Sequence, residues 1–364
     1  MTDSETREHM MTARSGKVQH PVTMQINTYP LDLPHLPHSL AHQMRTFGGQ
    51  VDRTIVTVDV RAPQSGRYKG DTKGDRYAES LKKVRQLYRE FEAKYDNLSF
   101  EEVDYGADAK SAVSRYFFGR DSIPDKAWDG GPFYCYFQGL KSAGDGYVLH
   151  MDADMLYGGQ SQTWIAEGID LLQRREDLLF VSPLAGPPHP DGLKGAHVNA
   201  SHAFRAETIG DRPAYRFRTV STRIFLMDMA RFKARIGSLP LDPPAFSQRL
   251  RGFLLGNPIE ALSAEWVLSN ALEANGLGNM HFRGSGAGMY SLHPPLHFPA
   301  FHDALPDIIA RIERDDIPDE QRGDYDINNS MFDLSSARQQ HVWHRRARRR
   351  LKDAVAYWTG RVHA

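Results

Sequence analysis

Short apolar runs rich in β-branched residues alternate with segments of helical periodicity along most of this chain. Residues 54–60, TIVTVDV, are typical of a buried strand, and residues 76–95 carry apolar side chains at helical spacing. Such alternation predicts an α/β fold with a mostly parallel sheet flanked by helices. In sheets of this kind, ligands bind beyond the carboxyl ends of the strands.

The same patterns predict the remaining elements. Strands are expected at 22–28, 54–60, 98–105, 147–151, 178–181, 219–227 and 279–282, and helices at 38–47, 76–95, 133–143, 163–173 and 259–275. Residues 186–210, rich in Pro, Gly and His, are expected to form a long loop, and residues 1–20 a disordered tail.

Composition narrows the class of protein. The 364 residues carry a formal net charge of zero, so no overall electrostatic attraction draws the chain to nucleic acid. The single cysteine, Cys135, excludes an internal disulfide and a multi-cysteine zinc site. There is no apolar run of 18 or more residues and no apolar core of the signal-peptide kind near the N-terminus. A cytoplasmic location is therefore expected.

An acidic pair ends one of the expected strands. The apolar run Tyr147–Met151 leads directly into Asp152, Ala153 and Asp154. Residues i and i+2 share one face of a strand, so both carboxylates could address one hard cation, Mg²⁺ or Mn²⁺. The alternative is a strand-end pair that caps the following turn.

With this motif in place, residues 22–300 resemble the glycosyltransferases of the GT-A (Rossmann-like) fold, most closely the family 2 group. The resemblance implies that Asp152 and Asp154 are the DxD motif, of which the first commonly faces ribose or uracil and the second commonly holds metal. It also implies that Thr28 and Tyr29 form a nucleotide-contacting turn and that Asp59 lies near the base. The chain departs from the family pattern after Asp59, where Val60 and Arg61 replace the usual glycine and serine.

The family resemblance further implies a catalytic base at the start of a helix that ends in glycine. Counting back from Gly276 places Glu265 at that position, and Glu260 is the reserve candidate. An inverting transfer needs such a base to take the proton of the acceptor hydroxyl. The alternative is a carboxylate that only complements the helix dipole.

Many members of the family carry a histidine as a further metal ligand beyond the last strand. His293 is the best placed, since a loop over the site would begin there; the other candidates are His281, His297 and His302.

Two further segments invite a functional interpretation. Trp128 could stack on a sugar, although a lone tryptophan is more often simply packed. The loop with His189, His197 and His202 could order over the donor as a lid.

The C-terminus differs in composition from the rest. Residues 336–358 combine seven basic side chains with apolar ones near four-residue spacing, which predicts a basic amphipathic helix. Docking on its own domain is the favoured interpretation, and contact with an anionic membrane is the second.

Together these features predict a tail at 1–20, a catalytic domain at 21–303 and a C-terminal helical extension at 304–364. The expected activity is transfer of a sugar, of hexosyltransferase type, from a UDP or GDP sugar to a glycan or small-molecule acceptor, with Mn²⁺ or Mg²⁺ and with inversion. A retaining transferase, a sugar nucleotidyltransferase and a non-catalytic carbohydrate-binding protein remain alternatives. Residues 26–40 lack the Gly, Lys and Arg that a nucleotidyltransferase phosphate loop needs.

Overall fold

The computed structural model describes residues 21–62, 75–194 and 204–340, together with short pieces of the tail at 347–348, 351–352, 354–355 and 358–359. The predicted tail at 1–20 lies outside the described residues, as do His197, His202 and most of the predicted C-terminal helix.

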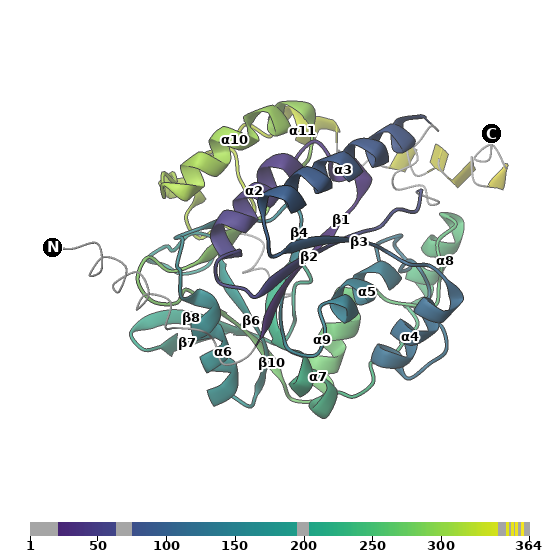
Figure 1. The fold of residues 1–364 in the computed structure, drawn as a ribbon, viewed down its shortest axis with the longest axis horizontal. Helices are drawn as coiled ribbons and strands as arrows, with labels where there is room; N and C mark the ends of the chain where they lie inside the picture. The colour runs from purple at the N-terminus through teal and green to yellow at the C-terminus, as the bar shows by residue number, and fades with distance from the viewer. Residues whose placement is uncertain are drawn as a thin grey trace.

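An 11-stranded sheet forms the centre of the molecule (Figure 1). Its main path runs in the order β3-β2-β1-β4-β9-β6-β10-β8-β7. Neighbouring strands from β3 to β4 pair in parallel, and β9 runs antiparallel between β4 and β6. β6 therefore points the same way as β4, and β10 is parallel to it. The strands are β1 (Val22–Thr28), β2 (Arg53–Val58), β3 (Leu98–Glu102), β4 (Tyr147–Asp152), β5 (Leu156–Gly158), β6 (Leu178–Ala185), β7 (Phe204–Ile209), β8 (Arg212–Phe217), β9 (Ile224–Asp228), β10 (Gly278–Phe282) and β11 (Tyr290–Leu292).

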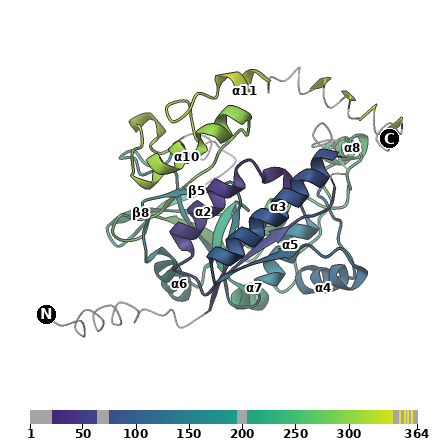
Figure 2. The same cartoon turned by 45° about the horizontal axis from the view of Figure 1, so that its top comes forward.

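Helices cover both faces of this sheet (Figure 2). Each face has its own hydrophobic core. The first core takes apolar side chains from α2 (Leu36–Phe47), α3 (Asp75–Lys94), α6 (Trp164–Arg174) and α10 (Pro299–Glu313). The second takes them from α4 (Ala107–Phe118), α5 (Tyr134–Ser142), α7 (Met229–Arg235) and α9 (Ala264–Ala274). Shorter elements complete the described chain: η1 (Pro30–Asp32), α8 (Phe246–Leu254), η4 (Asp319–Gln321) and α11 (Ser335–Gln340).

The predicted α/β class, with a mostly parallel sheet flanked by helices and further helices toward the C-terminus, is confirmed. The division at residue 303 stays a prediction; α10 crosses that position and packs against α2 and β5. No helix within the described part of the chain is long and apolar enough to cross a bilayer.

Three sequence predictions were wrong in detail. The expected loop at 186–210 is in part β7, which pairs with β8 through six residue pairs. The expected strand at 219–227 begins only at Ile224, after a turn. β10 is not the last strand, since β11 follows and pairs with β5 and β6. β5 and β11 escaped detection because each has only three residues.

The β5–β11 pairing positions the chain after the acidic pair. Its antiparallel register sets Leu292 opposite Leu156. His293, one residue beyond β11, therefore lies beside the turn that carries Asp154. A parallel bridge then joins His293 to Asp326 from the following segment.

A glutamine on α2 holds this turn. The Gln43 amide nitrogen donates to the carbonyl oxygens of Asp152, Ala153 and Met155, at 3.1, 3.2 and 3.1 Å. Gln43 is fully buried. A buried carbonyl without a donor is costly, so this side chain stabilises the turn by satisfying three of its carbonyl oxygens.

We expect Gln43→Met, which keeps the volume but removes the donor, to lower the free energy of unfolding by about 2–4 kcal/mol. Gln86→Met on the exposed face of α3 is the matched control and should change it by less than about 0.5 kcal/mol. Chemical denaturation of both variants measures the difference. Equal stability of the two variants would contradict the role given to Gln43.

Candidate active site

The acidic pair is built by the end of β4 and the turn that follows. Along β4, Tyr147, Leu149 and Met151 enter the first core, and Val148 enters the second. Asp152 continues the second series and faces α5 and α9. The strand ends at Asp152, so Asp154 lies on a turn. The prediction that the two carboxylates share one face of a strand was therefore wrong. The turn after β4 brings them together.

Asp152 is surrounded by groups of both signs. Partial burial raises its pKa well above the ordinary value, and Asp154, Asp32 and Glu265 raise it further. Arg223, from the turn before β9, opposes this shift. Glu265 lies in the first turn of α9, as predicted, and the structure brings it into the electrostatic neighbourhood of Asp152.

One buried hydroxyl lies within the electrostatic influence of both Asp152 and Glu265. Tyr136 on α5 is only 3% exposed. Its hydroxyl has no hydrogen-bond partner within the described residues. Burial raises the pKa of Tyr136 well above its usual range, and the charges of Asp152 and Glu265 add to the rise. An unpaired buried donor beside two carboxylates marks a place where a polar ligand group fits.

Two histidines approach Asp154. His297 Nε2 donates to Asp154 Oδ2 at 3.1 Å, and His293 Nε2 lies 3.9 Å from the same oxygen. Burial alone would raise the pKa of Asp154. The hydrogen bond from His297, and the positive charges of His293, His297 and His35 when these rings are protonated, outweigh burial and hold the pKa of Asp154 below its ordinary value.

His293 is fixed in the orientation that metal-binding histidines show. Its Nδ1 donates to Asp326 Oδ1 at 2.7 Å, which leaves the lone pair on Nε2, toward Asp154. The second oxygen of Asp154, Oδ1, is buried and accepts no hydrogen bond from any described residue. A carboxylate oxygen without a donor and an oriented imidazole suit a divalent cation such as Mn²⁺ or Mg²⁺.

The other predicted histidine in this part of the chain has a different role. His281 lies in β10, where its Nε2 bonds to Asn279 at 3.0 Å and its ring packs on Phe217. It belongs to the core and lies outside the site.

The predicted nucleotide residues line the neighbouring strand ends. Thr28 closes β1, and its buried hydroxyl bonds to Tyr88 and to the Thr57 carbonyl, so it offers a ligand only its backbone. Tyr29 donates its hydroxyl to the Arg61 carbonyl at 3.1 Å.

Asp59 follows β2, two strands from Asp152. Its carboxylate accepts from the Tyr105 hydroxyl at 2.9 Å and from Lys126 at 3.1 Å. A cavity of about 320 Å³ opens next to these two partners, and Phe253, Asn257 and Trp358 line it from the other side. Its size is at the lower end for small-molecule sites.

The remaining predicted residues make local contacts. Glu260 is exposed and accepts from the backbone of Ile259. Trp128 is half-buried, with the Arg251 guanidinium 5.5 Å from its ring centre. His189 bonds to Lys194 at 2.8 Å.

Comparisons with known proteins give distant likenesses only. No protein-family profile matches the chain. No curated protein matches it either. Among solved structures, a mannosyltransferase from Pyrobaculum calidifontis, in complex with GDP-Man and Mn²⁺, is 14% identical with a TM-score of 0.31, covering 68% of this chain and 56% of its own.

Two further structures lie at similar distance. S. aureus TarS 1-349 is 13% identical with a TM-score of 0.34, covering 74% of this chain and 60% of its own. A UDP-glucose pyrophosphorylase is 8% identical with a TM-score of 0.32, covering 73% and 91%. The chain thus spans a little over half the length of the first two proteins. At these TM-scores the likenesses carry no weight for activity.

Proposed function

We propose that this protein is a metal-dependent glycosyltransferase that moves a sugar from a nucleotide diphosphate to an acceptor hydroxyl, with inversion. The observation that carries the proposal is the turn of Asp152 and Asp154 at the carboxyl edge of the sheet, with His293 and His297 on one side and Glu265 on the other. Carboxylates, imidazoles and a helix-start acid at one strand end are the groups that such a transfer needs.

Asp154 and His293 would hold the cation, Mn²⁺ or Mg²⁺. When bound, the cation supplies positive charge to the two phosphates of the donor as the nucleotide departs. Arg223 interacts electrostatically with both aspartates and would add to this charge. Asp326 keeps His293 in the orientation required.

The nucleotide would lie along the ends of β1 and β2, against Tyr29 and Asp59. Adjacent strands are about 4.8 Å apart, so Asp59 and Asp152 are separated by roughly 10 Å across β1. That span suits a nucleoside whose diphosphate reaches the acidic turn. The cavity beside Tyr105 and Lys126 would take the base.

Glu265 would act as the base, taking the proton of the acceptor hydroxyl as this attacks the anomeric carbon. Its position at the first turn of α9, close to Asp152, supports the assignment. The alternatives are a retaining transferase, a nucleotidyltransferase and a binding protein. The stereochemistry of the product distinguishes a retaining transferase from the inverting one that we propose.

We expect UDP or GDP, or one of their sugar conjugates, to bind only with Mn²⁺, and Asp154→Ala to abolish that binding because it removes the carboxylate that meets the cation. Isothermal titration calorimetry with and without Mn²⁺ measures this. Asp170→Ala on the surface of α6 is the matched control. If the folded wild type binds no nucleoside diphosphate, the transferase proposal is wrong.

Glu265→Gln should lower turnover by about 10²- to 10⁴-fold while donor affinity stays within about twofold, since an amide cannot accept the proton. Nucleoside diphosphate release from the donor found by calorimetry provides the assay. Glu273→Gln, an exposed acid near the other end of α9, should keep full turnover. Near-normal turnover by Glu265→Gln would contradict the role of Glu265 as the catalytic base.

We further propose that α8 and the described pieces of the C-terminal tail contact an anionic membrane. Trp358 touches Phe253 of α8, with ring centres 5.2 Å apart. Yet Leu351 and Phe246 remain 66% and 80% exposed. Other exposed apolar side chains of α8 and the described tail are Leu250, Leu254 and Val355, and exposed basic ones are Arg249, Arg251, Arg348 and Lys352. Apolar side chains mixed with basic ones suit an anionic bilayer.

The full chain should therefore co-sediment with phosphatidylserine-containing vesicles at low salt and be released at high salt, because screening weakens the attraction. Phe246→Ser with Leu250→Ser should reduce the bound fraction severalfold. Vesicles of phosphatidylcholine alone are the control. Equal recovery with both lipids, or no recovery with either, would contradict a peripheral membrane contact.

A further inference from the structure

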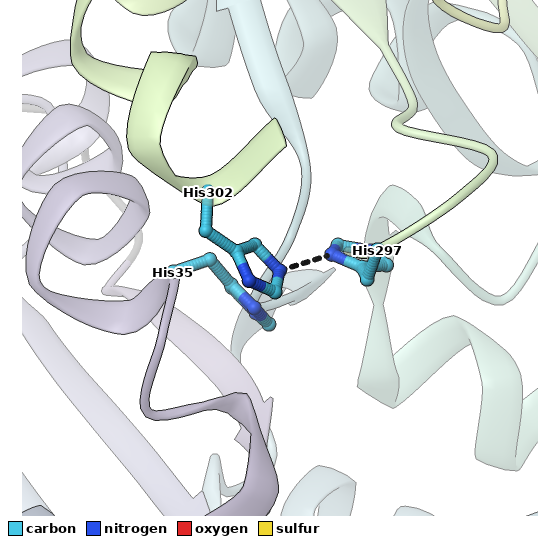
Figure 3. A group of neighbouring side chains, drawn as sticks. All are labelled: His35, His297 and His302. Carbon is cyan, nitrogen blue, oxygen red and sulfur yellow. Dashed lines mark hydrogen bonds between the residues drawn. The ribbon is translucent and has the colours of Figure 1, made fainter. Parts of the chain in front are cut away.

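Three histidines gather beside the acidic turn, and the proposed transfer uses none of them as a donor-metal ligand. The three-histidine cluster consists of His35, His297 and His302 (Figure 3). His35 immediately precedes α2, His297 lies between β11 and α10, and His302 is in the first turns of α10. One nitrogen from each ring lies within 4.8 Å of the other two.

The spacing of these nitrogens is close to that of a coordination shell. His302 Nε2 and His297 Nδ1 are 3.4 Å apart. Two imidazole nitrogens bound to one tetrahedral Zn²⁺ are roughly 3.3 Å apart, from Zn–N bonds of about 2.0–2.1 Å. The His35 ring centre lies 4.9 Å from that of His297, so a small inward movement completes a three-nitrogen set.

Independent of spacing, His35 presents a nitrogen without a partner. The residue is only 6% exposed, and its Nε2 has no hydrogen-bond partner among the residues that the structure describes. Burial and the neighbouring His297 lower the pKa of His35 to about 3, and burial also lowers that of His302. Both rings are therefore neutral near pH 7, which is the form that binds metal.

Asp154 sets the orientation of the third ring. Since its carboxylate accepts from His297 Nε2, the lone pair of His297 is on Nδ1, toward His302. A carboxylate that holds a histidine by its outer nitrogen is the usual support of a histidine bound to metal.

We propose that His35, His297 and His302 bind a transition-metal ion of the Zn²⁺ class, at a site separate from the cation held by Asp154 and His293. Imidazole nitrogens favour Zn²⁺ and Co²⁺, whereas Mg²⁺ prefers oxygen. The bound ion ties the start of α2 to the start of α10, two segments more than 250 residues apart in the sequence. Metal binding at this site needs no nucleotide, so it can be tested independently of the transferase proposal.

The test titrates Co²⁺ into the chelator-treated full chain without nucleotide, follows the visible absorption of the ion, and then displaces it with Zn²⁺. We expect one tight equivalent that excess Mg²⁺ does not displace. His302→Ala, at a partly exposed position, should weaken binding by more than the 10- to 100-fold typical of losing a supporting residue. His189→Ala, a matched change in a loop outside the cluster, and Asp326→Asn should retain it.

Thermal unfolding gives a second readout, since Zn²⁺ should raise the melting temperature of the wild type and of His189→Ala but leave that of His302→Ala unchanged. Binding that survives in His302→Ala, or that Asp326→Asn abolishes, would assign the ion to the Asp154–His293 position and overturn the proposal. Absence of any tight Co²⁺ or Zn²⁺ binding by the folded wild type would overturn it as well.

Discussion

Two carboxylates on one partly buried turn repel each other, and much of the surrounding structure offsets that repulsion. Asp152 responds with a raised pKa, while Asp154 stays charged beside the imidazoles of His293 and His297. Three backbone carbonyls of the same turn are held by Gln43. A cation bound at Asp154, as we propose, would reduce the remaining repulsion.

The strands around the turn bring other parts of the chain next to it. β5 leaves the turn and pairs with β11, which delivers His293. The bridge from His293 to Asp326 then brings in the segment after α10. Residues from the middle and the end of the chain thus meet at one strand end. Substitutions in the segment after α10 are therefore expected to alter the position of His293.

The sequence predicted the central strands well because β1, β2, β4 and β6 are buried on both faces and therefore appear as apolar runs. It missed β7, whose residues are mostly exposed or half-buried and so leave no apolar run. It also missed α4, β5 and β11. The three-residue strands are defined by tertiary pairing and have no local signal of their own.

The site divides in the same way. Asp152 and Asp154 could be singled out because they end an apolar strand, whereas Glu265 and His293 were singled out only through the family resemblance. Gln43, Tyr136 and Arg223 could not, since a glutamine on a helix face or a tyrosine in an apolar helix has no distinguishing local context. His35 lay in a proline-containing turn with no visible link to His302, and only the packing of α10 against α2 reveals it.

Anomalous diffraction from crystals grown with Mn²⁺ and a nucleoside diphosphate tests the central claim most directly. The account predicts a manganese peak within coordination distance, about 2.2 Å, of an Asp154 oxygen, with His293 Nε2 and the diphosphate on the same ion. A peak at another place, or a nucleotide bound away from the β1 and β2 ends, would contradict it.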